Sequence, residues 1–553
     1  MSIPRELRYF FVFFFSTGFV AGFAGVAEAQ QKRRVEIEHA GTLERDDSIV
    51  LNAERLLNNV RIRHNDNGND ILILCDSAYS YIGTNRVDAF GNVHINQGDT
   101  LDLYAHFVHY DGDISFARAI KDVRLVKEST TLYSDTLDYD ITNNVGYYDD
   151  WGKIVDSTNV LTSKMGRYFV SENLVWFYRD VEATNENYVL LSDTVRYNTE
   201  TSLIDIYGPT TIRDSVNIIF SEAGWYNSQT GEAKLTKNPV MYNESQILKG
   251  DIINYKREEK FGKAQGKVEI TDFENDVIVR GNNSWYDETS EIAFMTDSAL
   301  FIYISKGDSL FLHADTLKTI PDELEGEKII MAYRRAKFYR ADMQGKCDSL
   351  VYFTRDSTIQ MYQSPVLWSD NNQLVADFIE MKSNPETPNE LRLYNNAFII
   401  SEQDSAVFDQ VKGKNMIGYI IDNRLNYINV DGNGQAIYYV RDNEEDVGPN
   451  RTEGSRIKII FKEGKVNDIK FYTGITGNLK PMFQLVDSEK RLEGFDWKDR
   501  IRPKSKFDIF KWDDDTLSAS PRKEIQDVRQ EKMPKQATEE HDGHSHEQEK
   551  HEH

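Results

Sequence analysis

Apolar and polar residues alternate with a period of two along much of this chain. Around a central Gly-Asn pair, the apolar positions Val87, Ala89, Val93 and Ile95 alternate with polar ones. Val268 and Ile270 alternate in the same way with Lys267, Glu269 and Thr271. Strict alternation is typical of a β-strand with one buried and one solvated face. The central region keeps no 3.6-residue period long enough for a helix, so the pattern predicts an all-β protein.

A tyrosine recurs every 29 residues, and the residues before it are related from copy to copy. The series runs through Tyr81, Tyr110, Tyr139, Tyr168, Tyr197, Tyr226 and Tyr255. A turn followed by a short apolar strand comes about twelve residues after each tyrosine, as in Gly91-Asn92-Val93. Each repeat therefore predicts strand, turn, strand, turn. The period slips after Tyr255, and the next candidates are Tyr286 and Tyr352.

Hairpins of this length must stack, because one hairpin cannot bury its apolar face alone. Periodicity leaves two outcomes open: a rigid rod filled by its own side chains, or a trough with an open apolar groove. An open groove would shield acyl chains at about 0.8 kcal/mol per buried CH₂. We expect the tyrosines to stack and to pack hairpins together. The lipid-groove candidates are the inward-facing residues Val87, Val93, Ile95, Val268 and Ile270.

Changes in composition predict four parts. Residues 1–29 are typical of a signal peptide, with two arginines, an apolar run and an Ala-Glu-Ala cleavage site; a retained membrane anchor is the alternative. Residues 30–404 contain the repeats, and residues 405–512 form a β-rich terminal portion. Residues 513–553 are polar, acidic and rich in histidine, and we expect them to be disordered.

Charge and motifs restrict the chemistry. A net charge of −25 argues against nucleic acid as a partner. The sequence has no Gly-x-Ser-x-Gly, His-Glu-x-x-His or phosphate-binding loop, so we expect neither catalysis nor a cofactor. We expect a solvated tail rather than a metal site at its histidines. Cys75 and Cys347 are expected to be free or structural thiols.

The recurring strand openers and turns resemble the OstA-like family. The resemblance rests on Asp99-Thr100-Leu101, Asp135-Thr136-Leu137 and Ala89-Phe90-Gly91-Asn92-Val93, and it covers about residues 35–400. The family includes LptA-like bridge proteins and the LptD N-terminal domain. The resemblance implies an extended antiparallel β-jellyroll, open along one side, that holds lipid A acyl chains. It also implies edge-to-edge stacking with other lipopolysaccharide transport proteins. The length suggests the long members found in Bacteroidetes-type bacteria.

The expected function is periplasmic lipopolysaccharide binding and transport that contributes to outer-membrane assembly, with an outer-membrane translocon as a further partner. Two alternatives stay open. A β-helical carbohydrate-active enzyme would need Asp, Lys and Arg clustered on adjacent strands, whereas the Lys and Arg residues here are scattered. A structural or adhesive scaffold would bind no ligand at all.

Overall fold

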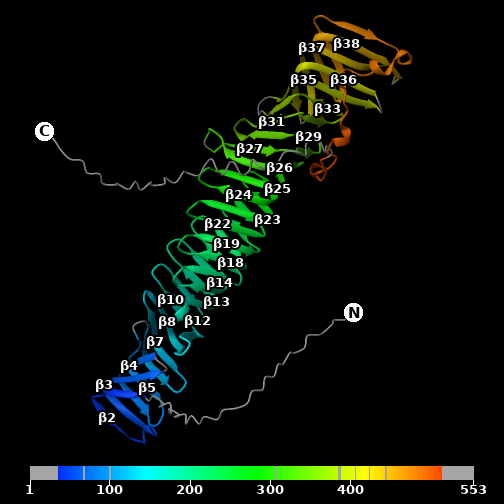
Figure 1. Ribbon diagram of the computed structural model, residues 1–553. Helices are drawn as coiled ribbons and strands as arrows, with labels where there is room; N and C mark the ends of the chain where they lie inside the picture. The colour runs from blue at the N-terminus through cyan, green and yellow to red at the C-terminus, as the bar shows by residue number, and fades with distance from the viewer. Residues whose placement is uncertain are drawn as a thin grey trace, which may run out of the picture. The chain divides into compact units, whose positions relative to one another are not determined.

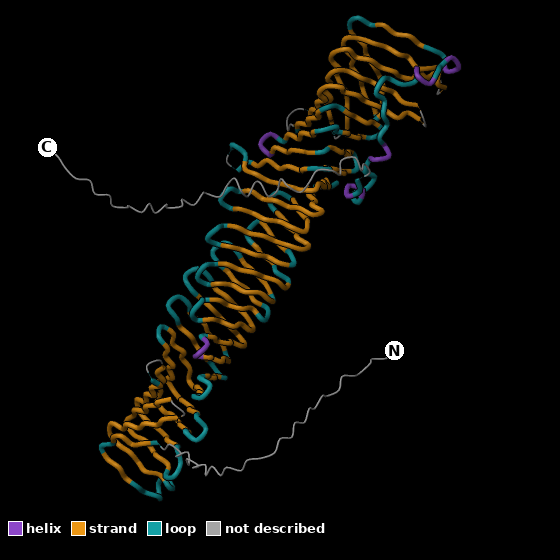
Figure 2. Tube along the Cα trace, viewed as in Figure 1, coloured by secondary structure: helices purple, strands orange, loops and turns teal. Residues whose placement is uncertain are grey.

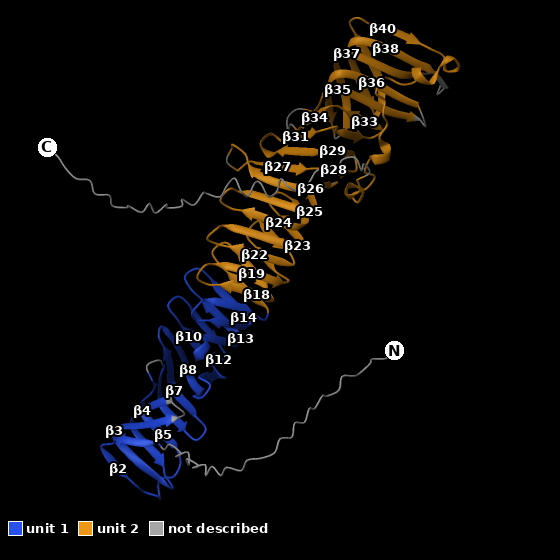
Figure 3. Ribbon diagram, viewed as in Figure 1, with its two compact units in different colours: residues 1–208 blue, residues 209–553 orange. Residues whose placement is uncertain are grey.

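The computed structural model describes residues 35–66, 69–98, 101–305, 308–324, 326–383, 388–404, 407–422, 424–442 and 445–512. The predicted signal peptide and the histidine-rich tail lie outside these residues. Antiparallel strands make up 69% of the described residues, which confirms the predicted all-β class (Figure 2). No helix within the described ranges is long and apolar enough to span a bilayer. The chain divides into two compact units, residues 1–208 and 209–553 (Figure 3).

In unit 1, each long strand pairs with the strands before and after it in the chain (Figure 1). Its elements are β1 (Glu36–His39), β2 (Thr42–Glu44), β3 (Ala53–Asp66), β4 (Asn69–Tyr81), β5 (Arg86–Gln97), β6 (Leu101–Asp111), β7 (Phe116–Lys127), β8 (Thr130–Asp140), β9 (Val145–Tyr148), β10 (Gly152–Val155), β11 (Val160–Ser163), β12 (Met165–Phe169), the 3₁₀ turn η1 (Val170–Glu172), β13 (Leu174–Thr184), β14 (Val189–Asn198) and β15 (Leu203–Ile206).

Unit 2 repeats this ladder and ends in its longest strands. Its elements are β16 (Thr210–Arg213), β17 (Ile218–Ser221), β18 (Ala223–Asn227), β19 (Glu232–Lys237), β20 (Val240–Tyr242), β21 (Gln246–Lys249), β22 (Ile252–Lys256), β23 (Phe261–Asp272), β24 (Val277–Asp287), β25 (Ile292–Tyr303), β26 (Leu310–Pro321), β27 (Lys328–Tyr333), β28 (Ala336–Arg340), β29 (Met343–Cys347), β30 (Ser349–Phe353), η2 (Thr354–Asp356), β31 (Thr358–Tyr362), β32 (Val366–Ser369), β33 (Asn372–Val375), β34 (Phe378–Lys382), β35 (Asn389–Asp404), β36 (Val407–Ile421), β37 (Arg424–Asp442), β38 (Glu445–Lys462), β39 (Lys465–Tyr472), β40 (Thr476–Leu479), η3 (Met482–Gln484), η4 (Asp487–Glu489), η5 (Asp499–Ile501) and η6 (Asp508–Phe510). The predicted boundary between residues 404 and 405 falls between β35 and β36, and these two strands pair with each other. The boundary stays a prediction.

The turn expected at Gly91-Asn92-Val93 is instead a bulge inside β5. Gly91 and Asn92 have φ angles of 73° and 42°, and the pairing of β5 with β6 shifts between Phe90 and Val93. Two successive left-handed residues interrupt a ladder without ending the strand. The Asn92 amide donates to the Asp76 carboxylate at 2.9 Å, which holds the bulge against β4. β7, β13 and β23 have left-handed pairs at the corresponding place.

The bulges fold the ladder over on itself. The turns at one end of the folded strands form an edge that we call rim A, and in unit 1 they include residues 128–129, 156–159 and 185–188. The turns at the other end form rim B, and they include residues 82–85, 112–115, 141–144 and 170–173. A flat strand as long as β5 would separate the rims by about 35 Å. Yet Gln97, at the rim A end of β5, donates to Asn144 of rim B at 3.0 Å. The two halves of each strand therefore enclose a common interior.

A C-terminal segment, residues 482–512, lies along the outer face of unit 2, and we call it the strap. Backbone groups of the strap pair with buried glutamines: Gln373 donates to the Asp496 carbonyl at 2.7 Å, and Gln410 to the Lys490 carbonyl at 2.8 Å. Leu492 packs into a buried cluster on the long strands. The strap covers polar side chains that would otherwise face solvent.

Candidate functional site

The inner face of the folded ladder is built from tyrosines that alternate with smaller residues. Inner tyrosines occupy every second strand, and the residue opposite each on the next strand is an alanine, a glycine or an aliphatic residue. The pairs in unit 1 are Tyr110 with Val87 and Ala117, Tyr139 with Ala117 and Gly146, Tyr168 with Gly146 and Val175, and Tyr197 with Val175 and Ile204. The rings therefore pack hairpins together without stacking on one another.

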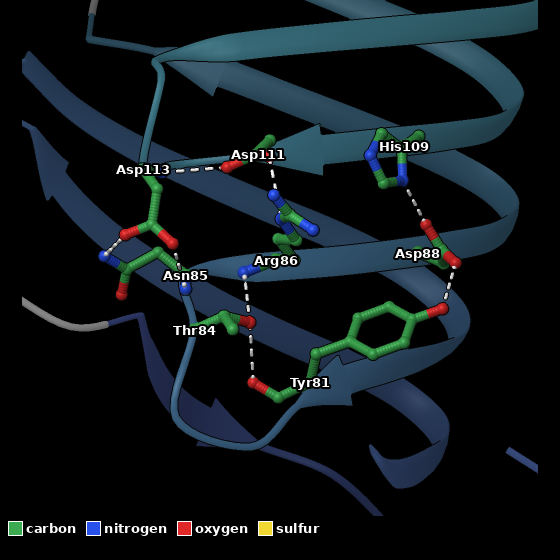
Figure 4. Close-up of polar contacts among 8 residues, drawn as sticks. All are labelled: Tyr81, Thr84, Asn85, Arg86, Asp88, His109, Asp111 and Asp113. Carbon is green, nitrogen blue, oxygen red and sulfur yellow. Dashed lines mark hydrogen bonds and ion pairs between the residues drawn. The ribbon is translucent and has the colours of Figure 1, made fainter. Parts of the chain in front are cut away.

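Unit 2 contains a column of the same kind. Tyr226, Tyr255, Tyr286 and Tyr352 pair with Ala233, Gly262, Ala293, Ile330 and Ile359. Tyr286 and Tyr352 therefore carry the column past the point where the 29-residue period slips. Tyr81 departs from it, because its hydroxyl bonds to Asp88, which lies on the outer face of β5 between the inward Val87 and Ala89 (Figure 4).

Hydrogen bonds join the two rims along unit 1. The Tyr110 hydroxyl, near rim B, lies 2.6 Å from Nδ1 of His64, near rim A. The Tyr139 hydroxyl lies 3.2 Å from the side-chain oxygen of Gln97, and Lys127 of β7 donates to the Val170 carbonyl at 2.6 Å. The interior of unit 1 is therefore closed along these strands by contacts between opposite rims.

A buried polar network closes the rims further along unit 1. Asn159 of rim A donates to the Tyr197 hydroxyl at 3.0 Å and accepts from the Tyr188 hydroxyl at 3.1 Å. The Tyr197 hydroxyl donates to Asp156. Burial, and then the Asp156 carboxylate, raise the pKa of Tyr197, so its phenol stays protonated. A neutral donor suits this position, because it pairs with the Asp156 carboxylate.

Behind these contacts the interior of unit 1 is filled by side chains. Val87, Val93 and Leu125 are at most 1% exposed. A cavity of about 10 Å³ lies between Ile95, Leu103 and Tyr139, which is room for one water molecule. An acyl chain would need the rims to separate before it could enter here.

The inner face becomes accessible in unit 2. Met241, Leu248, Ile270, Val279 and Phe301 face one another across neighbouring strands, and every one of them is partly exposed. We call this row the accessible stretch.

In the accessible stretch, the residues at the base of the inner face, which we call its floor, are buried, whereas the residues at its sides are exposed to solvent. On the rim B side, Tyr286 is 42% exposed, whereas Tyr168 and Tyr197 of unit 1 have no exposed surface. The floor is closed by buried residues such as Ala264 and Ala299. This surface is apolar, inward-facing and open to solvent, as a site for an acyl chain requires.

The five lipid-groove candidates divide between the two units. Val87, Val93 and Ile95 lie on the inner face of β5, and all three are buried. Val268 is buried in the floor of β23, and Ile270 lies two residues further in the accessible stretch. Their contact with lipid stays a prediction.

Sequence reasoning missed Met241, Leu248, Val279 and Phe301. The run Val277-Ile278-Val279 is apolar on both faces, so a period of two gives no orientation there. β20 and β21 are short and start next to irregular residues. β21 pairs with β23, where alternation is clear, and β20 pairs with β21, so the inner face of both follows from the orientation of β23.

A polar network on the outer face of unit 1 ties β4, β5 and β6 together (Figure 4). The Tyr81 hydroxyl donates to Asp88 at 2.7 Å, and Nδ1 of His109 lies 2.5 Å from the other oxygen of that carboxylate. The bond to Asp88, together with burial, raises the pKa of Tyr81 to about 12. Arg86 pairs with Asp111 at 2.8 Å. The three strands are thereby linked across their outer face.

The two thiols are free and buried. Burial raises the pKa of Cys75 to about 11, and burial raises the pKa of Cys347 as well. Thiolate chemistry is therefore disfavoured at neutral pH. Cys75 borders an outer cleft of about 620 Å³ with Glu38, His39 and Arg61. No group of His, Cys, Asp and Glu suited to a metal ion occurs among the described residues.

A family model described as OstA-like protein matches residues 32–193 and 184–301. The chain belongs to the OstA-like family. The two matches span unit 1 and the strands of the accessible stretch. OstA-like domains belong to transport and binding proteins, and the family is associated with lipopolysaccharide transport in the periplasm. No curated protein matches the chain.

Proposed function

We propose that this OstA-like protein binds lipopolysaccharide in the periplasm and carries it between the inner and outer membranes. Its acyl chains lie on the accessible stretch of unit 2. The observation that carries this proposal is the partial exposure of apolar inward-facing side chains at Met241, Leu248, Ile270, Val279 and Phe301, in contrast to the buried inner face of unit 1. Each CH₂ group covered there contributes about 0.8 kcal/mol.

Unit 1 supports a second step in the same proposal. Its inner face offers the same apolar surface at Val87, Val93 and Ile95, but rim-to-rim hydrogen bonds close it. Lipid reaches these residues when the rims separate. Each hydrogen bond contributes about 0.5–1.5 kcal/mol net, so opening at a few rim contacts is within reach of a bound lipid.

The partners follow from family membership. We propose that other lipopolysaccharide transport proteins pair with the terminal strands of the ladder, and that an outer-membrane translocon receives the lipid. In unit 1, β1 and β2 pair with β3, and in unit 2, β39 and β40 pair with β38. Unpaired backbone groups on a terminal strand are available to the strand of a second protein.

Photo-crosslinking in living cells tests this proposal. A photoreactive phenylalanine analogue at Ile270 or Val279 should form an adduct with lipopolysaccharide, because both residues line the accessible stretch. Thr271 is the matched control, since it follows Ile270 on the same strand and faces outward. The adduct is detected with an antibody against lipopolysaccharide after denaturing electrophoresis.

Crosslinking at Val93 reports whether unit 1 opens. An adduct there shows that lipid passes through the closed interior. Absence of adducts at Ile270, Val279 and Val93, in protein that is folded and exported, would leave the ligand-free scaffold as the better description.

A further inference from the structure

The residue before each inner tyrosine faces outward, so a row of outer side chains accompanies the tyrosine column. In unit 1 most cations of this row pair with carboxylates, whereas Arg167 lies 5.7 Å from the centroid of the Tyr147 ring. His109 faces Asp88, Arg118 lies 2.6 Å from Asp138, and Arg196 lies 2.8 Å from Asp205. Positive charge on the outer face of unit 1 is therefore largely compensated within the row.

The corresponding row of unit 2 contains lysines and large aromatic residues. Successive cross-strand pairs join Trp225, Lys234, Asn254, Lys263, Trp285, Phe294 and Lys318. We call this set the lysine–aromatic row. Trp285 stacks on Phe294 with ring centroids 4.3 Å apart, and the Lys318 ammonium lies 5.2 Å from the Phe294 ring.

The lysines of this row lack the carboxylates that neighbouring lysines have. Lys256 pairs with Glu259 at 2.6 Å and Lys249 with Glu269 at 3.3 Å. Among the described residues, no such ion pair forms at Lys234, Lys263 or Lys318. In a chain with a net charge of −25, three uncompensated ammonium groups on one row are complementary to an anionic ligand.

We propose that the lysine–aromatic row binds the phosphorylated sugar headgroup of the amphiphile whose acyl chains lie on the accessible stretch. Phosphate groups pair with the lysine ammonium groups, and the apolar faces of the sugar rings lie on Trp285 and Phe294. This inference rests on the proposed function and adds the chemistry of the headgroup to it.

The two surfaces lie on the same strands. Gly262 and Tyr286, beside Lys263 and Trp285, face inward near rim B. Phe261 and Asp287 end these strands at the rim, two residues from Lys263 and Trp285, which is about 7 Å along a strand. A headgroup that leaves the inner face over the rim B turns at residues 257–260 and 288–291 therefore reaches the row without detaching its acyl chains.

Binding of two lipids to the purified full-length protein tests the inference. The probes are deep-rough lipopolysaccharide, which is phosphorylated, and the same lipid after enzymatic dephosphorylation. The double variant Lys263→Gln/Lys318→Gln should weaken binding of the phosphorylated lipid about tenfold and leave the dephosphorylated lipid unchanged. Lys249→Gln/Lys256→Gln is the matched control, because it removes the same charge from lysines that already have carboxylate partners.

A third variant, Ile270→Asp, separates this inference from the proposed function. It should weaken binding of both lipids, since it places a charge in the accessible stretch. If it does so while the Lys263/Lys318 variant binds both lipids normally, the headgroup site is wrong and the proposed function stands. Equal losses in the two lysine double variants would also overturn the site. If Ile270→Asp changes neither affinity, acyl binding on the inner face is wrong. The proposal that one lipid contacts both the inner face and the lysine–aromatic row is then wrong as well.

Discussion

At the 29-residue positions, a tyrosine ring has to share the interior with the strands on either side. The rings fit because each strand that carries a tyrosine is followed by a strand that carries a smaller side chain at the position facing it. Tyr148 shows the principle in its tightest form. It is 4% exposed and lies between Gly152 and Gly166, where a Cβ atom at either glycine would overlap its ring. Its hydroxyl pairs with Ser163 at 2.7 Å, so the ring has little freedom to move away.

Gly166→Ala should therefore lower the free energy of unfolding by about 1–3 kcal/mol, because the added methyl group overpacks the interior. Gly146→Ala is the control. A Cβ there would meet Leu137 at 3.4 Å, an ordinary contact, and the variant should be neutral or stabilised by up to about 1 kcal/mol. Urea unfolding of both variants measures the difference. Similar stabilities would show that glycine at position 166 does not serve the Tyr148 ring.

At the scale of elements, sequence and structure agree on strands and differ on what interrupts them. Alternation and the 29-residue period predicted the strands and the inward residues of β5 and β23. The Gly91-Asn92 pair was expected to be a turn, since glycine and asparagine are common in turns and bulges alike, and Gly266-Lys267 forms a bulge at the corresponding place of β23. Only the pairing partners distinguish a bulge from a turn, because the strand resumes its register on the far side.

The open part of the candidate site was harder to predict for a related reason. Exposure of Ile270 and burial of Val93 depend on whether opposite rims touch, and rim contacts such as Gln97 with Asn144 join residues far apart in the chain. Local periodicity contains no information about these contacts. It could therefore identify the inward face but could not choose between a filled interior and an open one.

The local fold of the strap around residues 505–511 should depend on pH. The Asp508 carboxylate accepts from Lys511 and Ser505, which lowers its pKa to about 2 from an ordinary value of 3.8. A lowered pKa in the folded state stabilises the strap above about pH 4, and this contribution is lost as the pH falls towards 2. Asp508→Asn should loosen residues 505–512 at pH 6, and the difference from the wild type should narrow below pH 4. Hydrogen exchange of the strap measures this, and a difference that stayed constant with pH would contradict it.

At the scale of the whole molecule, the two units differ in how completely their inner faces are closed. Unit 1 has buried inner side chains and rims joined by hydrogen bonds, whereas part of unit 2 leaves apolar residues in contact with solvent. A net charge of −25 opposes self-association through these exposed apolar residues. This difference between the units suits a binding protein, because a strand region with few buried side chains opens locally at a lower cost in free energy.

Native-state hydrogen exchange should show this division. Amides of β5–β8 should exchange more slowly than those of β21–β25, because their interior is filled and their rims are joined. Bound lipopolysaccharide should slow exchange in β21–β25 first. Uniform exchange across these strands in the lipid-free protein would mean that the inner face of unit 2 is as firmly closed as that of unit 1.

The alternation of tyrosine with a small residue also determines how this family of chains can change in length. A single strand gained or lost would place two tyrosines on neighbouring strands, so the smallest tolerated change is a pair of strands. Such a pair is 29 residues in the regular part of the column and 31 residues between Tyr255 and Tyr286. Duplication of one such segment lengthens a unit by about 10 Å and repeats every inner contact. Insertion of a single residue instead turns the remainder of its strand inside out. The length of the inner face can therefore change during evolution only by whole pairs of strands.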